Sequence, residues 1–167
     1  MLKKPVSSTA LVAAVLGSAP ALAADDARSA IHISATIPTQ QFHVMPRDPE
    51  FGKNEVMNYN PVNNTLSSLR QTYDVKNTEG SIHAYLEGGT AYLIGGRNVA
   101  DYIQLLTLFN GVLLSETPKE VVTDAASTPG TQADLYIRQA TAIKDDQEGL
   151  YTADITLIFD AVPRITP

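Results

Sequence analysis

The chain has 167 residues, no cysteine, 12 lysines and arginines against 18 aspartates and glutamates, and a formal net charge of −6. The missing cysteines exclude disulfides, thiol catalysis and cysteine-based metal sites. The acidic balance argues against nucleic acid and against anionic membrane surfaces, so we expect no nucleic acid among the partners.

A secretory signal peptide is expected at residues 1–23. Its basic start is Lys3-Lys4, its apolar core at 10–16 contains only alanine, leucine and valine, and its end has small residues at the positions that a signal peptidase recognises. The expected cleavage site consists of Ala21, Ala23 and Ala24, with the cut between the last two. Cleavage there would remove two lysines and take the formal charge from −6 to −8.

The mature chain is expected to be one domain behind a short leader. Residues 24–30 would be a flexible polar leader, and residues 31–167 a single domain with a substantial core. No later run is long and apolar enough for a transmembrane helix, so we expect an exported protein that is not embedded in a membrane by a helix.

Residues 31–37 form the first predicted strand. Apolar residues alternate there with polar or small ones, which gives the strand one apolar and one polar face. The apolar face contains Ile31, Ile33, Ala35 and Ile37. Pro38 ends the run because it lacks a backbone donor. Such a strand can pair within its own domain, which the periodicity alone favours, or be added to a neighbouring molecule.

Short runs separated by turns make up the rest of the chain. They lie at 42–45, 55–60, 69–75, 81–87, 91–94, 102–109, 112–114, 120–122, 133–137 and 152–159. Asn110-Gly111 is typical of a two-residue hairpin turn. The run 102–109 is the most apolar, so we expect a central strand covered on both faces. No segment has a sustained helical period, and the sequence therefore predicts an all-β, immunoglobulin-like antiparallel β-sandwich.

Residues with catalytic or metal-binding chemistry are sparse. The three histidines, His32, His43 and His83, do not have the spacing of a zinc motif. The charged loop with Asp145, Asp146 and Glu148 lacks the ligand alternation and central glycine of a calcium loop. The chain also has no nucleophile elbow and no phosphate-binding glycine loop. We therefore expect no enzymatic activity, no cofactor and no metal.

Several stretches, taken in order, resemble the major subunits of class 5 (alpha) fimbriae, the coli-surface-antigen 1 type that includes the cable pilins. They are 31–38 (IHISATIP), 57–61 (MNYNP), 74–78 (DVKNT), 149–151 (GLY) and 155–160 (ITLIFD). The resemblance covers nearly all of the mature chain, and the signal peptide and the lack of cysteine agree with it. The segment 46–49, with its two prolines, and the tail 163–167 depart from the family pattern.

The resemblance implies an incomplete sandwich that is completed by a donated N-terminal strand. A periplasmic chaperone would supply the missing strand first, and an outer-membrane usher would drive its replacement by residues 31–37 of the next subunit. The donor face would be the one formed by Ile31, Ile33, Ala35 and Ile37. The protein would then polymerise with itself into a cell-surface fimbria that supports adhesion, and a separate tip adhesin subunit would bind the receptor.

A secreted, monomeric β-sandwich adhesin or carbohydrate-binding module is the alternative. Tyr85, Tyr92 and Tyr102, if exposed, would stack on sugar rings. In such a module the strand 31–37 would pair within its own domain, whereas a fimbrial subunit would polymerise. The sequence does not indicate which residues would accept a donated strand.

Overall fold

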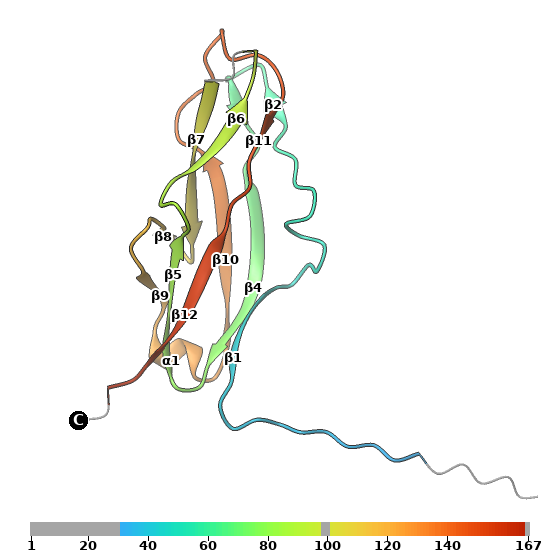
Figure 1. Ribbon diagram of the computed structural model, residues 1–167, viewed down its shortest axis with the longest axis vertical. Coiled ribbons are helices and arrows are strands. Elements are labelled where there is room, and N and C mark those ends of the chain that lie inside the picture. The colour runs from blue at the N-terminus through green and yellow to red at the C-terminus, as the bar shows by residue number, and fades with distance from the viewer. Residues whose placement is uncertain (1–30, 98–100, 166–167) are drawn as a thin grey trace, which may run out of the picture. The chain divides into compact units, whose positions relative to one another are not determined.

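The computed structural model describes residues 31–97 and 101–165 (Figure 1). The chain divides into two units, residues 1–36 and 37–167. The described part of the first unit, residues 31–36, contains no strand or helix, and the second unit contains all the elements below. The expected signal peptide, its cleavage site and the leader 24–30 lie outside the described residues.

Two antiparallel sheets form the second unit. The larger sheet has the order β1 (Phe42–Pro46), β4 (Leu69–Asn77), β10 (Thr131–Gln139), β7 (Asp101–Phe109), β6 (Ala91–Gly95) and β11 (Tyr151–Thr152), with β8 (Val112–Leu113) paired to β7. The smaller sheet has the order β12 (Leu157–Pro163), β5 (Gly80–Leu86) and β9 (Lys119–Val122). A separate short ladder joins β2 (Tyr59–Asn60) to β3 (Thr65–Leu66).

A one-turn helix, α1 (Asp124–Ser127), lies between β9 and β10 along the chain. This helix was not predicted, because a single turn is too short to produce a helical period. No helix in the described part of the chain is long and apolar enough to span a bilayer.

The core lies between the two sheets, because every second residue of the central strands faces inward. In β5, Ile82, Ala84 and Leu86 are buried, as the alternation predicted. The larger sheet contributes buried residues from β4, β7 and β10, namely Val75, Leu105, Phe109, Ala133, Leu135 and Ile137. The prediction of an all-β, immunoglobulin-like antiparallel sandwich is confirmed.

The turn after β7 also agrees with its sequence. Asn110 and Gly111 have φ angles of 50° and 79°, and β7 pairs antiparallel with β8 across them. Positive φ at both central residues matches the twist of the flanking strands. The Asn110 side-chain amide also donates to the Val121 carbonyl at 2.6 Å, which ties the turn to β9.

The expectation that β7 is covered on both faces was wrong for the described chain. One face lies in the core, but Tyr102 on the other face is 61% exposed, and no described segment forms a layer over it. Leu108 on this outer face is half-buried. The register places Leu113 and Tyr136 beside it, so side chains of the same sheet shield it and no second layer is required.

The final run, predicted at 152–159, is two strands. β11 pairs with β6 of the larger sheet, whereas β12 pairs with β5 of the smaller one. Residues 153–156 therefore carry no strand, because the chain crosses there from one sheet to the other.

Candidate functional site

Residues 31–37 have the alternation of a strand but no strand partner among the described residues. Ile31, Ile33 and Ile37 are 80%, 84% and 81% exposed, and Ala35 is exposed as well. Exposed apolar surface costs about 25 cal/mol per Å² relative to burial. The segment therefore gains stability wherever its apolar face can be covered.

The strand β12 has one paired edge and one unpaired edge. It pairs with β5 and stands at the end of the smaller sheet. At its two ends, Glu87 N–H donates to the Thr156 carbonyl at 3.1 Å and Arg164 N–H donates to the Glu79 carbonyl at 2.7 Å. Backbone groups alternate in direction along an antiparallel strand. The backbone N–H and C=O groups of the even-numbered residues of β12 therefore point toward β5. Those of Leu157, Phe159 and Ala161 point toward the unpaired edge.

Pro163 agrees with this assignment. It is the last residue of β12 and, being odd-numbered, would direct a backbone N–H to the unpaired edge. Proline has no such donor and is confined to edge positions in sheets. β12 is thus an edge strand by sequence as well as by topology.

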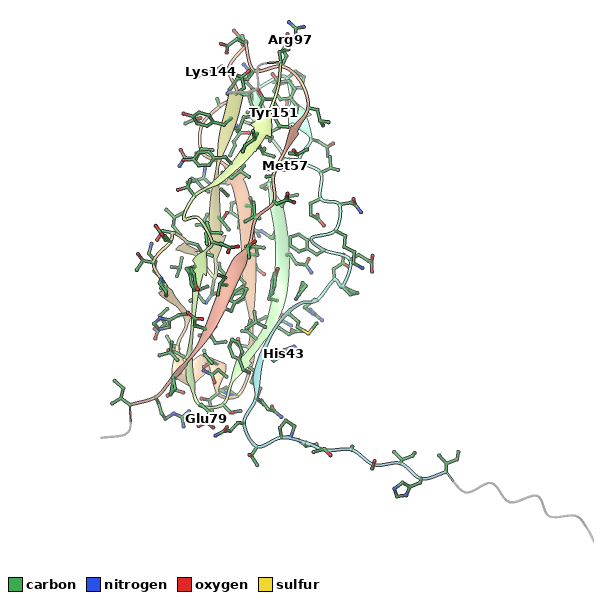
Figure 2. All side chains as sticks on the ribbon, in the orientation of Figure 1. His43, Met57, Glu79, Arg97, Lys144 and Tyr151 are labelled. Atoms are coloured by element: carbon green, nitrogen blue, oxygen red, sulfur yellow. The ribbon has the colours of Figure 1, made fainter. Side chains whose placement is uncertain are left out.

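The core is only half covered beside β12. Half-buried apolar side chains pack against the core from β12, β4, β1 and the loop after β1, namely Leu157, Phe159, Leu69, Tyr73, Val44, Phe51 and Met57. Ring contacts from Phe159 to Tyr73 and from Tyr73 to Phe51 connect this group to β12. Met57 is labelled in Figure 2. By contrast, Ala133 and Leu135 of the central strand β10 are each 1% exposed. We call the unpaired edge of β12, together with these half-buried residues, the open edge.

Aromatic rings cross the open edge from one sheet to the other. Tyr73 lies 6.5 Å from Phe51, 5.4 Å from Phe109 and 6.2 Å from Phe159, measured between ring centroids. Phe109 and Phe159 are 4.9 Å apart in an edge-to-face arrangement. Such pairs add about 0.5–1.5 kcal/mol beyond the burial of their area. Partial burial raises the pKa of the Tyr73 phenol above its ordinary value. The rings therefore keep the two sheets together where the strand ladder is incomplete.

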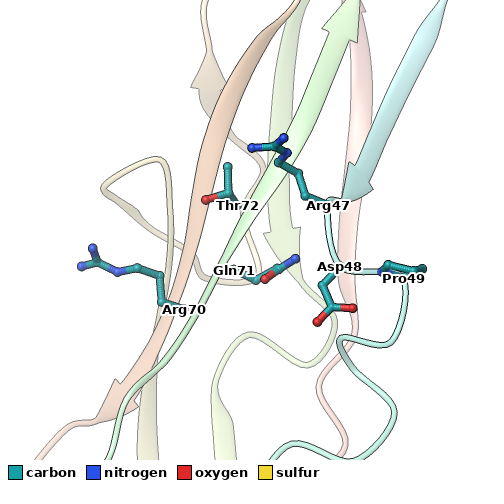
Figure 3. A pocket seen from close by; sticks show the side chains of 6 residues that line it. All are labelled: Arg47, Asp48, Pro49, Arg70, Gln71 and Thr72. Atoms are coloured by element: carbon teal, nitrogen blue, oxygen red, sulfur yellow. The ribbon is translucent and has the colours of Figure 1, made fainter.

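A shallow depression of about 680 Å³ lies next to the loop after β1 (Figure 3). It is lined by Arg47, Asp48, Pro49, Arg70, Gln71 and Thr72. Both arginines already have partners within the fold. Arg47 Nε lies 3.7 Å from a carboxylate oxygen of Asp74, and the Arg70 guanidinium lies 5.1 Å from the centre of the Tyr136 ring. The Thr72 hydroxyl donates to Asp134 at 2.7 Å, and Asp48 accepts a hydrogen bond from the Glu50 N–H at 2.9 Å, so these polar groups of the lining also have partners within the fold.

The other candidate residues are dispersed. His32 and His43 are exposed, and His83 on β5 is half-buried. Within the described residues, no three histidine, aspartate or glutamate side chains converge on a point where they could hold a metal ion. In the charged loop, Glu148 forms an ion pair with Arg97 at 2.8 Å.

The tyrosines of the alternative hypothesis are not on one surface. Tyr92 and Tyr102 are neighbours in the larger sheet, with ring centroids 5.4 Å apart and an edge-to-face arrangement. Tyr85 belongs to β5 of the smaller sheet. Tyr92 is 39% and Tyr102 61% exposed, whereas Tyr85 is half-buried. Two of the three tyrosines therefore lie together as exposed rings, and the third belongs to the other sheet.

Sequence reasoning singled out residues 31–37 but none of the open edge. The alternation of Leu157 and Phe159 was visible, but it is the same in a fully buried strand. Only the pairing partners of β12 show that these residues are half covered.

Comparison with known proteins identifies the family. The model of the CS1 type fimbrial major subunit matches residues 27–160, which include residues 31–37 and most of the sandwich. A search of curated protein sequences returned no match. Among solved structures, the CooA pilin subunit from enterotoxigenic Escherichia coli matches with 12% sequence identity and a TM-score of 0.47, covering 73% of this chain and 99% of that one.

The family match extends over most of the chain and agrees with the resemblance that its motifs indicated. A fimbrial major subunit is a structural protein and not an enzyme, and it polymerises with copies of itself into a fibre on the cell surface. The protein therefore belongs to the CS1-type fimbrial major subunits.

Proposed function

We propose that the subunits polymerise by donating residues 31–37 of one copy to the open edge of the next. The single observation that carries this proposal is the match between an unpaired, exposed strand sequence and an edge strand beside a half-covered core. Each copy has one of each, so the contact is head-to-tail and does not close on itself. A heterologous contact of this kind builds a filament.

The lengths of the two partners support the pairing. Seven residues of donor span roughly 23 Å, and β12 also has seven residues. A donor strand beside β12 would bond with the outward-facing backbone groups of Leu157, Phe159 and Ala161. These groups have no ladder partner in the described chain, and buried backbone groups are nearly always paired.

The apolar faces also match. We call the proposed contact between residues 31–37 of one subunit and the open edge of the next the joint. In the joint, the apolar face of the donor covers the half-buried residues of the open edge and completes the core; this face is formed by Ile31, Ile33, Ala35 and Ile37. Three isoleucines at about 1.5–3 kcal/mol each stabilise the joint by roughly 5–9 kcal/mol. This is an upper bound on the apolar contribution, because the free segment already shields part of its surface.

The path to the cell surface belongs to the same proposal. The signal peptide at 1–23 directs export and is cut between Ala23 and Ala24, which leaves the leader 24–30 and a domain of residues 31–167. An exposed apolar edge would aggregate in the periplasm, so a periplasmic chaperone covers it until an outer-membrane usher exchanges the chaperone for the next subunit. The fibre supports cell adhesion, and a separate tip adhesin subunit contacts the receptor.

Engineered disulfides test the placement of the donor strand. The chain has no cysteine, so each introduced pair is the only one present. Ile33→Cys, Ala35→Cys and Ile37→Cys are each combined with Ala161→Cys on β12, because a disulfide forms only when the Cβ atoms lie about 3.5–4.5 Å apart. Cells carrying each pair are analysed by electrophoresis without reductant.

At least one pair is expected to give a ladder of covalent multimers from surface fibres. The matched control replaces Ala161→Cys with Glu120→Cys on β9, the strand at the opposite end of the same sheet. A ladder from the β9 pairs, or fibres without a ladder from any β12 pair, would overturn the proposed joint.

A further inference from the structure

Arg164, directly after β12, contacts both α1 and the turn between β4 and β5. Its Nε donates to one carboxylate oxygen of Asp124 at 3.0 Å, and its Nη2 donates to the other at 2.8 Å. The same Nη2 lies 2.9 Å from the Thr128 hydroxyl and 3.2 Å from the Thr78 carbonyl. The Arg164 backbone N–H donates to the Glu79 carbonyl at 2.7 Å. Figure 2 labels Glu79 at this end of the molecule.

The partners of Arg164 are themselves fixed. α1 carries Asp124, and its Ser127 is fully buried with its hydroxyl donating to the Gly80 carbonyl. The Thr128 hydroxyl donates to Asp124 at 2.8 Å, which orients the carboxylate toward the guanidinium. A bidentate arginine–carboxylate pair on a rigid support is the geometry in which an exposed ion pair contributes to stability. Arg164 is therefore anchored to a part of the fold that does not depend on β12.

β12 is a core strand that needs such an anchor. It is bonded along one edge only in the described sheet. Strands with few partners open locally at a low free energy. If β12 separated from β5 before assembly, Leu157 and Phe159 would no longer be in position to pair with a donor strand.

We infer that Arg164 is a latch that holds β12 in place while its outer edge has no partner. This inference rests on the proposed function, since it concerns the strand that would accept the donor. The latch is a positioning residue: it contacts no donor residue and acts through β12. The family match covers Asp124 and ends at residue 160, before Arg164.

Hydrogen exchange measured by mass spectrometry tests the latch. The mature subunit is refolded from urea and kept dilute, and its exchange is compared with that of assembled fibres. In the dilute subunit, Arg164→Gln is expected to accelerate exchange in residues 157–163 about 5-fold, the factor that corresponds to an exposed bidentate pair. Residues 131–139 of β10 should exchange at the wild-type rate. In fibres the variant and wild type should agree, because the donor strand then holds β12.

Two further variants make the result decisive. Asp124→Asn removes the other half of the pair and should reproduce the Arg164→Gln pattern, with no further acceleration in the double variant. Arg97→Gln removes an exposed ion pair with Glu148 that does not involve β12, and should leave exchange in β12 unchanged. Equal acceleration of β10 and β12, or none in β12, would overturn the latch. If residues 157–163 exchange as fast in wild-type fibres as in the dilute wild-type subunit, the proposed joint is refuted. The latch is tested separately, by comparing Arg164→Gln with wild type in the dilute subunit.

Discussion

Replacing Ile33 by aspartate places a carboxylate in the middle of the apolar face of residues 31–37. In the proposed joint this side chain is covered by the open edge of the next subunit. The substitution removes about 1.5–3 kcal/mol of isoleucine burial. It also leaves an unpaired buried charge, which costs several kcal/mol more even after the surroundings relax. Together these losses are comparable to the roughly 5–9 kcal/mol of the apolar contribution, so each joint should weaken by about a thousandfold or more.

Electron microscopy of the expressing cells measures the outcome, together with an immunoblot of the periplasm. Ile33→Asp should abolish surface fibres and leave the subunit folded in the periplasm, because the change lies in the donated strand and not in the sandwich. His32→Asp is the matched control: it adds the same charge one residue away, on the opposite face of the strand, and fibres should persist. Abundant fibres from Ile33→Asp would refute the joint. An insoluble Ile33→Asp subunit, with no fibres from wild type, would show that the strand pairs within its own domain, as in a monomeric binding module.

Four further predictions concern the subunit itself. Gly80→Ala should destabilise the sandwich by about 1–3 kcal/mol in urea unfolding, because the added Cβ would clash with the Val162 carbonyl oxygen of β12; an unchanged midpoint would contradict this close approach. Thr107→Val should stabilise by about 1 kcal/mol, since the buried Thr107 hydroxyl has no hydrogen-bond partner in the described chain, and a loss of stability would show that it has one. The hydrogen bonds from Arg164 and Thr128 lower the pKa of Asp124, so the pair stabilises the fold above the ordinary carboxyl pKa; this part is lost as the pH falls through the lowered pKa, and Asp124→Asn should remove it from unfolding curves measured against pH. The intact mass of exported protein should correspond to an N-terminus at Ala24, and a mass that retains residues 1–23 would refute the signal peptide.

Local patterns predicted the parts of the fold that depend on neighbours in sequence. The alternation of Ile82, Ala84 and Leu86 identified the inward face of β5, because side chains in a strand alternate whatever the strand pairs with. Asn110-Gly111 identified its hairpin, because both residues accept the positive φ angles that the turn needs. These features follow from backbone geometry over a few residues.

The open edge depends on which strands lie beside one another, and no local pattern carries that information. Leu157 and Phe159 alternate as in any core strand, and only the sheet order shows that no strand of the described chain pairs with the outer edge of β12. The outer face of β7 illustrates the same limit, since Leu106 and Leu108 suggested a covering layer that the described chain does not supply. Residues 31–37 showed their apolar face in sequence, but not what covers it.

The position of Tyr73 gives the subunit a built-in optical reporter. The chain has seven tyrosines and no tryptophan, so its near-ultraviolet absorption comes mainly from phenol rings. Tyr73 lies in the open edge with a phenol that is only half-buried. A strand laid over it would transfer the ring from a partly aqueous to a more apolar environment and displace its absorption to longer wavelength. The same covering would raise the phenol's pKa further, since desolvation disfavours phenolate. Polymerisation could then be followed by difference spectroscopy on the unlabelled protein.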